Sequence, residues 1–267
     1  MIELFKEIWA TVQHNKLRTT LTGFAVGWGI FILIFLLGAG NGLINAQMHQ
    51  SERFLANSIV VFGGVTSKPH NGFDRGRRIS LENRDLLTTT NNFEENIQET
   101  GATLWKPGNT FSLGANYIAS QNLCGAYPVK VKIDKIEIVH GRFVNDIDIR
   151  EKRKVIVLTQ TQAKELSKDI AALLGKYIKV NDTMFRVVGI SKDDKSGENN
   201  TAHSPFTTIS TIYNYGHRVD RIEFTFGGVS TEEESDAFED RYRASINANH
   251  DAASDDESAL WVWNRLA

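Results

Sequence analysis

The chain has 267 residues, of which 41% are hydrophobic and 23% are charged, and its formal net charge is -2. This nearly neutral balance argues against the strongly basic surface that nucleic-acid binding normally needs, so we expect no nucleic-acid partner. The single cysteine, Cys124, cannot form an internal disulfide, and we expect it to be a small buried residue.

The N-terminal residues 1–18 have the pattern of an amphipathic helix. Apolar residues recur there at helical spacing, with polar residues on the other side. Because this helix directly precedes an apolar run, we predict an elbow helix on the cytoplasmic membrane surface. Its apolar residues are Ile2, Phe5, Ile8, Trp9 and Val12.

A transmembrane helix is predicted over residues 19–40. Residues 21–40 are twenty consecutive positions without a charge, which as a helix would cover roughly 30 Å, the thickness of a bilayer's hydrocarbon core. Lys16 and Arg18 precede the run, and positive charge beside a span is retained in the cytoplasm. We therefore expect a cytoplasmic N-terminus, with residues 41–267 outside the cytoplasm.

Two further interpretations concern the apolar run itself. A cleaved signal peptide is the alternative to a span, because residues 38–40 are small, although a signal's apolar core runs only about 7–15 residues. Gly23 and Gly27 form a GxxxG pair, which indicates a candidate face for packing against another helix.

Helices and strands follow in mixed order. We predict a polar helical extension over 41–56, a buried strand over 57–65, and a helix over 80–96 that begins at Ser80. From 102 to 138 we predict short strands divided by turns at 106–109 and 114–116, with alternating residues at 129–133 as the last of these strands. The remaining predictions are strands at 155–158, 178–180, 185–190 and 221–226, helices at 160–172 and 231–249, and a solvated loop at 193–200. The outer region thus begins and ends with a strand followed by a helix, which predicts an inserted, strand-rich second domain.

No pattern in the sequence predicts catalysis, a cofactor or a metal ion. The seven histidines do not share the spacing that places two ligands on one helix face. The chain has no GxxxxGK[ST] phosphate loop and no GxSxG motif around a nucleophilic serine. We therefore expect a protein that is not an enzyme and does not itself bind ATP.

Two groups of residues resemble the MacB-like and FtsX-like permeases of ABC transporters. The string NKLRTTLTGFAVGWGIFILI resembles the elbow and first span of these permeases, with a signature filled by Lys16, Arg18, Thr19, Leu21 and Thr22. The segment around HGRFVND resembles the MacB periplasmic domain, and the later LLGKYIKVNDTMFRVVGI resembles a strand pair of the same domain. The signature residues there are Gly141, Arg142, Phe143, Asp146, Gly175, Lys176 and Gly189.

The resemblance implies an α+β fold in which one N-terminal transmembrane helix precedes a divided periplasmic region. The inserted part would be a β-rich subdomain of the kind called Sabre, within a porter-like α/β subdomain. The implied boundaries are an elbow helix at 1–18, a span at 19–40, a helical extension at 41–56, a porter-like subdomain at 57–139 and 219–267, and a Sabre-like subdomain at 140–218.

The resemblance also implies partners and a place in the cell. Permeases of this kind form homodimers or heterodimers in the bacterial inner membrane and work with a cytoplasmic ABC ATPase, which here would be a separate protein. A periplasmic adaptor or an outer-membrane protein is a further candidate partner. The expected work is mechanical: ATP-driven motion passes to the periplasmic domain for efflux, lipoprotein release or envelope remodelling.

The sequence departs from the family pattern after its periplasmic region. The family has four spans, whereas this chain has no second long apolar run. We expect a truncated chain, because Leu260, Trp261, Trp263 and Leu266 have the pattern of a helix approaching a second span. The alternative is a C-terminal helix that packs its tryptophans into its own domain.

Two other functions compete with the permease hypothesis. The first is a single-span, membrane-anchored periplasmic binding or adaptor module without an ATPase partner. The second is an anchored hydrolase, which no motif supports.

Overall fold

The computed structural model describes residues 16–51, 57–193, 201–227 and 232–264. Most of the predicted elbow helix at 1–18 and of the predicted loop at 193–200 therefore lies outside the described residues, as does Leu266. The chain forms two units, Met1–Glu52 and Arg53–Ala267, which are described in turn.

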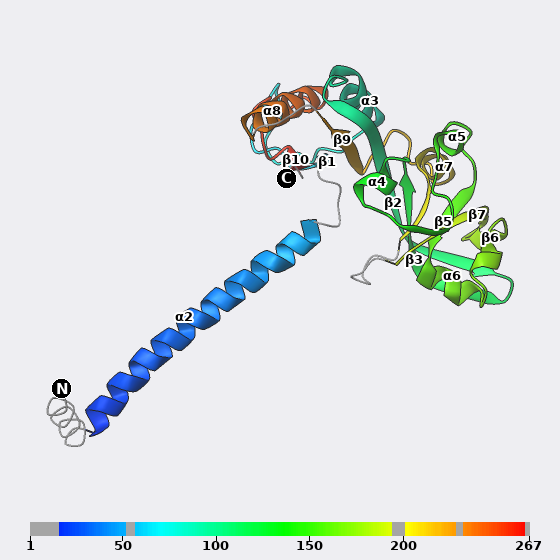
Figure 1. Ribbon diagram of the computed structural model, residues 1–267. Helices are drawn as coiled ribbons and strands as arrows, with labels where there is room; N and C mark the ends of the chain where they lie inside the picture. Colours follow the sequence, from blue (N-terminus) through cyan, green and yellow to red (C-terminus); the bar gives the residue numbers. More distant parts are fainter. Residues whose placement is uncertain (1–15, 52–56, 194–200, 228–231, 265–267) are drawn as a thin grey trace. The chain divides into compact units, whose positions relative to one another are not determined.

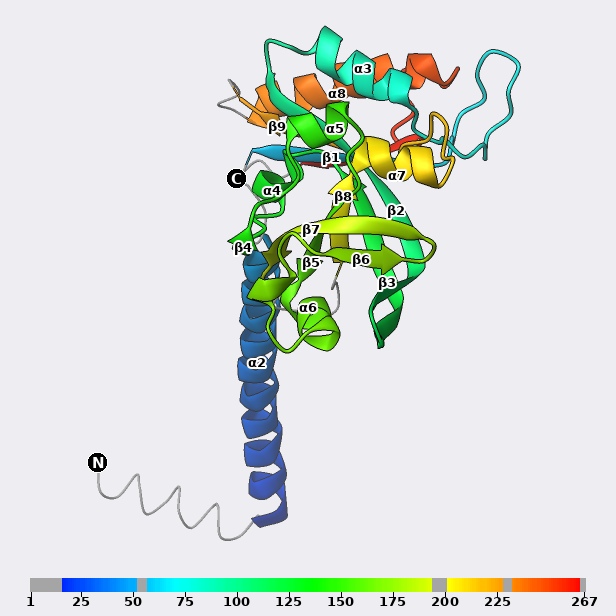
Figure 2. The same cartoon turned by 90° about the vertical axis from the view of Figure 1, so that its right-hand side faces the viewer.

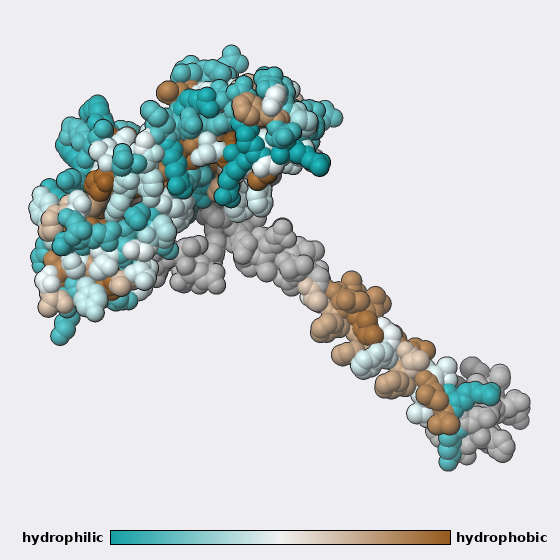
Figure 3. Space-filling model, turned by 180° about the vertical axis from the view of Figure 1, so that it is seen from behind, coloured by the Kyte–Doolittle hydropathy of each residue, from teal (hydrophilic) through white to brown (hydrophobic). Residues whose placement is uncertain are grey.

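The first unit consists of the single long helix α2 (Lys16–Ser51), drawn in blue in Figure 1. It contains the predicted span and continues through most of the predicted extension at 41–56 as one helix. Within its segment Lys16–Ala39, a window of 18 residues has a mean hydropathy of 2.2 and none of its residues is buried, so the segment is long and apolar enough to cross a membrane. Figure 3 shows this segment as a brown apolar band with hydrophilic residues at its N-terminal end.

The second unit is an α/β structure built on one hydrogen-bonded sheet. Within the described residues, its strands follow the order β10-β1-β9-β2-β3-β8-β5-β7-β4, and β6 pairs with both β2 and β7. The strands are β1 (Ser58–Gly63), β2 (Ile97–Leu113), β3 (Asn116–Ala126), β4 (Ile138–Gly141), β5 (Val155–Thr159), β6 (Tyr177–Val180), β7 (Thr183–Ser191), β8 (Thr201–Pro205), β9 (Arg221–Phe226) and β10 (Leu260–Asn264). The predicted strands at 57–65, 155–158, 178–180, 185–190 and 221–226 are confirmed.

The helices lie in two groups along this sheet, which Figure 1 shows at opposite ends of the unit. One group contacts β2 and β10, and the other contacts β2, β3, β5, β7 and β8. The first group is α3 (Asn83–Asn92) and α8 (Glu232–Asn249); the second is α5 (Asp146–Arg150), α6 (Gln160–Leu166), the 3-10 turn η1 (Ala171–Leu173) and α7 (Phe206–Ile212), with α4 (Lys130–Ile133) beside β9.

The pairing of β6 closes half of the sheet into a ring. The pairs β2–β3, β3–β8, β8–β5, β5–β7, β7–β6 and β6–β2 return to their starting strand, whereas β10, β1 and β9 remain an open sheet beside the first half of β2. The long strand β2 therefore belongs to both parts. The apolar core continues from the open sheet into the ring, so it marks no boundary between two subdomains. The predicted division of the chain at residues 140 and 218 stays a prediction.

A bulge in β2 marks the place where the strand passes from the open sheet into the ring. The expected turn at 106–109 is instead a shift of register against β3 between Lys106 and Asn109. Pro107 has no N–H to donate to a ladder, and Gly108 has a positive φ of 74°, which favours a bulge over regular pairing. The Asn109 side chain fills the gap, donating to the Lys106 and Gln121 carbonyl oxygens.

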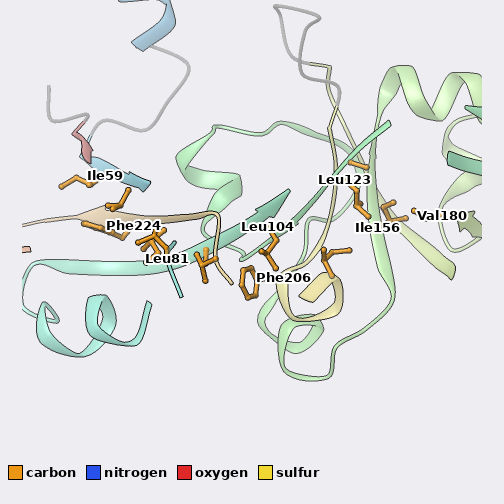
Figure 4. Packing of buried hydrophobic residues seen from close by; sticks show 14 of the residues in the cluster. Ile59, Leu81, Leu104, Leu123, Ile156, Val180, Phe206 and Phe224 are labelled. Atoms are coloured by element: carbon orange, nitrogen blue, oxygen red, sulfur yellow. The ribbon is translucent and has the colours of Figure 1, made fainter. Parts of the chain in front are cut away.

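One apolar core runs through both parts. Figure 4 shows the buried side chains as a row from Ile59 and Phe224, through Leu104, to Ile156 and Val180. Under the open sheet, aromatic side chains of α8 pack on β9. At roughly 25 cal/mol per Å² of apolar surface, such continuous burial stabilises the two parts together.

Two of the sequence predictions for strands and helices are wrong. Residues 129–133 form the helix α4 instead of a strand, because Val129 and Ile133 are buried on one side at i and i+4 while Pro128 begins the turn. Residues Leu260–Asn264 form β10 instead of a helix. There Leu260 is buried and Val262 packs against the core, which is the period-two pattern of a strand whose two tryptophans lie on the other face.

Two predicted helices have different limits. The first begins at Asn83 after Glu82, not at Ser80, because the Asp85 carboxylate accepts the Glu82 backbone N–H at 2.8 Å. The helix predicted over 160–172 ends at Leu166. There Ser167 adopts an extended backbone, and Asp169 accepts the N–H of Ala172 and begins the separate turn η1.

Candidate functional site

The N-terminal signature residues Lys16, Arg18, Thr19, Leu21 and Thr22 form the first turns of α2. The Thr22 hydroxyl donates to the Arg18 carbonyl oxygen one turn earlier, so the hydroxyl has a hydrogen-bond partner within its own helix. A helix that enters hydrocarbon needs this kind of internal pairing, because lipid offers no partner. The two basic residues remain exposed at the N-terminal end of the apolar segment.

The candidate packing face of α2 is open. A Cβ atom added at Gly23 or Gly27 would meet no other atom within 4 Å. An adjacent stripe carries aromatic rings in contact along the helix, Phe24, Trp28, Phe31 and Phe35, with centroid separations of 5.5–6.4 Å. Packing of the glycine face against another helix stays a prediction.

In the second unit, two signature glycines let β4 and β7 approach closely. Gly141 and Gly189 lie opposite each other in the antiparallel pair. A Cβ at Gly189 would lie 2.1 Å from the Arg142 carbonyl oxygen, and a Cβ at Gly141 would lie 2.3 Å from the Val188 carbonyl oxygen. Gly141 also has a positive φ of 76°. Both positions therefore require glycine for a structural reason.

The arginine of the same motif is fixed by an acid that the sequence analysis did not single out. Arg142 binds both carboxylate oxygens of Asp148, at 2.5 and 3.1 Å, and donates to the Phe143 carbonyl oxygen. Asp148 is fully buried and also accepts the Asn145 N–H, whereas Asp146 lies exposed in the first turn of α5. The only available signal was the capping pattern of Asn145 three residues before Asp148.

The remaining signature residues border the same strand. The Gly175 N–H donates to the Val187 carbonyl oxygen at 2.8 Å, and the Val187 N–H donates to the Lys176 carbonyl oxygen at 2.9 Å. A shallow hollow of about 230 Å³ lies here, lined by Arg142, Leu174, Gly175, Arg186, Val187 and Val188. The structure thus brings Gly141, Arg142, Gly175, Lys176 and Gly189 together around β7, where their backbone contacts join β4 and the segment before β6 to this strand.

A buried cluster of charges lies where the open sheet meets the ring. Lys130 of α4 is 2% exposed, and its Nζ lies 2.5 Å from Asp134 and 3.6 Å from Glu223 of β9. Arg221 lies 3.5 Å from the same Glu223 oxygen, and its guanidinium lies between the rings of Phe62 and Trp105. Burial disfavours a charged lysine, but the two carboxylates outweigh it and raise the pKa of Lys130.

Cys124 of β3 and His203 of β8 border this cluster. Burial raises the pKa of the Cys124 thiol to about 12, so it packs as an unreactive apolar residue, as predicted. Burial, together with the nearby Lys130 charge, lowers the pKa of His203 to about 3. His203 packs its ring against Phe143, and its Nδ1 has no hydrogen-bond partner within the described parts of the chain.

The buried His203 gives the fold an expected sensitivity to acid. An unfolded chain binds a proton at this side chain near pH 6.5, whereas the folded chain does so only near pH 3, so stability falls as pH falls between these values. In His203→Gln we expect the slope of unfolding free energy against pH to decrease by up to about 1.4 kcal/mol per pH unit between pH 6 and 4. Denaturation at several pH values measures the slope. The packing lost in the variant lowers the unfolding free energy equally at every pH, so it does not change the slope. An unchanged slope would contradict the assignment.

The contacts described so far explain how the fold is held together. Among the residues that the structure describes, no group of three His, Cys, Asp or Glu side chains is placed to hold a metal ion. The elements present are an apolar helix of spanning length and an α/β unit whose open sheet and ring share β2. This arrangement defines a class of proteins only by its fold, an α/β domain joined to one apolar helix of spanning length.

Comparison with known proteins identifies the family within that class. The family description "MacB-like periplasmic core domain" matches residues 19–244. The chain therefore belongs to this family, and it is a MacB-type periplasmic domain of an ABC transporter permease with one N-terminal apolar helix.

Relatives of known family agree with this assignment. The macrolide export ATP-binding/permease protein MacB of Aggregatibacter actinomycetemcomitans is 21% identical over 226 residues, which are 83% of this chain and 34% of the relative. MacB of Campylobacter fetus is 27% identical over 212 residues, 77% of this chain and 31% of the relative. The chain thus spans about a third of the length of these relatives.

The fold is similar to two solved extracytoplasmic domains. The periplasmic region of MacB from Actinobacillus actinomycetemcomitans has a TM-score of 0.63 at 20% identity, covering 80% of this chain and 91% of that structure. The extracellular domain of the noncanonic ABC-type transporter YknZ from Gram-positive bacteria has a TM-score of 0.61 at 15% identity, covering 78% of this chain and 100% of that structure. The predicted fold class is confirmed.

Proposed function

We propose that this chain is the N-terminal part of a permease subunit that passes ATP-driven motion from a separate cytoplasmic ATPase to its periplasmic domain. The motion would serve efflux, lipoprotein release or envelope remodelling. The observation that supports this proposal is the continuity of α2, whose apolar segment ends at Ala39 while the helix continues to Ser51, shortly before β1 begins at Ser58. Twelve further helical residues extend it by about 18 Å. A continuous helix transmits a displacement along its axis better than a flexible linker does.

The proposal includes an orientation and partners. Lys16 and Arg18 favour a cytoplasmic N-terminus in the bacterial inner membrane, with residues 41–267 in the periplasm. The open glycine face of α2 is suited to a second span, in a homodimer or in a heterodimer with a related permease. A periplasmic adaptor or an outer-membrane protein would complete the assembly.

Breaking α2 between its apolar segment and β1 tests the mechanical role. We would insert four glycines after Asn45, with four alanines at the same place as the control. Both insertions lengthen the chain equally, but only glycine is expected to interrupt the helix. A fluorophore on Tyr117→Cys reports motion of the outer domain, since Tyr117 is exposed whereas Cys124 is buried.

The expected result is an ATP-dependent fluorescence change that the alanine insertion keeps and the glycine insertion reduces at least tenfold, while an ABC ATPase still co-purifies with both. Failure of the full-length protein to co-purify with any ABC ATPase would overturn the coupling. Full function of residues 41–267 on an unrelated span would instead support the anchored adaptor module.

A further inference from the structure

The connection between β1 and α3 contains a preformed projection, residues 65–78, which we call the arm. In Figure 2 it is the cyan loop beyond the sheet. Backbone bridges pair Val65 with Arg78 near its base and His70 with Phe73 at its tip. The turn between the tip residues has positive φ values of 47° at Asn71 and 83° at Gly72, as in the tightest hairpin turns. The arm is therefore a defined structure, although it belongs to no strand of the sheet.

A buried acid fixes the base of the arm. The Asp256 carboxylate is fully buried and accepts hydrogen bonds from the Ser67 N–H and hydroxyl, both at 2.7 Å, and from the Lys68 N–H at 3.0 Å. Burial alone would raise the pKa of Asp256, but these hydrogen bonds and one from Ser258 hold it below its usual value. Arg77 adds hydrogen bonds to two carbonyl oxygens of the 250–251 turn. A projection held in this way loses little conformational entropy when it binds.

The arm exposes the residue types that protein interfaces favour. Val65 and Phe73 are each 47% exposed, and the Arg77 guanidinium stacks 4.5 Å above the Phe73 ring. Arg75 and Arg78 are exposed and form no salt bridge with any described residue. Aromatic side chains and arginine are enriched at interfaces and dominate their binding energy.

The charge of the arm is opposite to that of the whole chain. Four basic residues and one acidic residue lie within it, namely Lys68, Arg75, Arg77, Arg78 and Asp74, which give +3 against -2 for the chain. Asp255 pairs with Lys68 at 2.6 Å, so the three arginines supply the charge that is offered to a partner. Charge complementarity therefore favours an acidic partner.

Its fixed shape favours a protein over a lipid surface. Hydrogen bonds to the Asp256 carboxylate hold its base, and a backbone bridge between His70 and Phe73 holds its tip. A rigid projection gains most from a partner surface of complementary shape, which a folded protein offers and a fluid lipid surface does not.

We propose that the arm is a docking site for an exported protein that presents carboxylates around an apolar pocket. Phe73 is the anchor that enters the pocket, and Arg75 and Arg78 pair with the carboxylates at its rim. This interaction does not rest on coupling to an ATPase, so either proposal can fail without the other.

Photo-crosslinking in the cells that naturally make the protein tests the proposal. A benzophenone amino acid replaces Phe73 in the full chain, and the control carries it at Tyr117, another exposed aromatic residue, beside the β2–β3 turn. The same crosslinker is then combined with R75E/R78E, which changes only exposed side chains. We expect an adduct with another exported protein at position 73, mapped by mass spectrometry to a peptide rich in Asp and Glu, absent at position 117 and reduced at least tenfold by R75E/R78E.

Several results would overturn the proposal. The first is a yield of protein adduct at position 73 no higher than the yield at position 117. The second is an adduct formed only with lipid or only with a second copy of this chain. The third is an adduct whose yield R75E/R78E does not reduce. An unchanged melting temperature of the R75E/R78E chain confirms that loss of the adduct is not loss of fold.

Discussion

Gly189→Ala is expected to destabilise the periplasmic unit by about 3 kcal/mol, because overpacking a closely fitted site costs roughly this much. The added Cβ would lie 2.1 Å from the Arg142 carbonyl oxygen, which is a backbone atom and cannot rotate away as a side chain can. Relief requires separating β4 from β7, which also strains the Arg142–Asp148 pair at the end of β4. Urea denaturation of the detergent-solubilised chain measures the loss as a lower transition midpoint.

Gly175→Ala is the matched control, since it adds the same methyl group to a signature glycine near the same strand. Gly175 has a positive φ of 80°, but the nearest atom to its added Cβ is in the flexible Arg186 side chain, 3.7 Å away. The Gly175→Ala variant then loses only the ease with which glycine adopts a positive φ, which lowers the unfolding free energy by about 1 kcal/mol. Equal losses in the two variants would show that close approach of β4 and β7 does not explain the requirement for Gly189.

The sequence was sufficient to predict the apolar helix and most of the strands. Residues 21–40 are apolar without interruption, and strands such as 155–158 are continuous runs of β-branched and aliphatic residues, so their patterns have one interpretation. Short segments were harder. Residues 129–133 alternate as a strand does, and a contact distant in sequence, from Lys130 to Glu223, adds to the local turn at Pro128 in favouring a helix there.

The candidate sites were predictable in part. The glycines and Arg142 of the signature do gather around β7, but Asp148, which fixes Arg142, was not singled out, since a buried acid and an exposed one such as Asp146 look alike in a sequence. The ring of strands was also unpredictable, because it depends on the pairing of β6 with β2, about 70 residues apart. The arm contains no motif, and its structure depends on Asp256, which lies near the other end of the chain.

Lys130→Met is expected to destabilise the unit by about 3 kcal/mol, because removing one member of a buried ion pair leaves its partner without compensation. Glu223 would keep only Arg221, at 3.5 Å, while remaining fully buried. The double variant Lys130→Met/Glu223→Met removes the charge together with its counter-charge, and apolar replacement of a whole pair is often close to neutral.

A double-mutant cycle of these variants separates the pair from the packing around it. We expect the double variant to be more stable than Lys130→Met alone, with a coupling energy of about 2 kcal/mol measured by denaturation. Additive losses would mean that Lys130 acts mainly through Asp134, four residues away on the same turn.

Coupling to Glu223 has a mechanical consequence, because Lys130 follows β3 of the ring whereas Glu223 belongs to β9 of the open sheet. Rotation of one part against the other would then have to separate these charges, so the cluster resists independent motion of the two parts and favours movement of the periplasmic domain as one body.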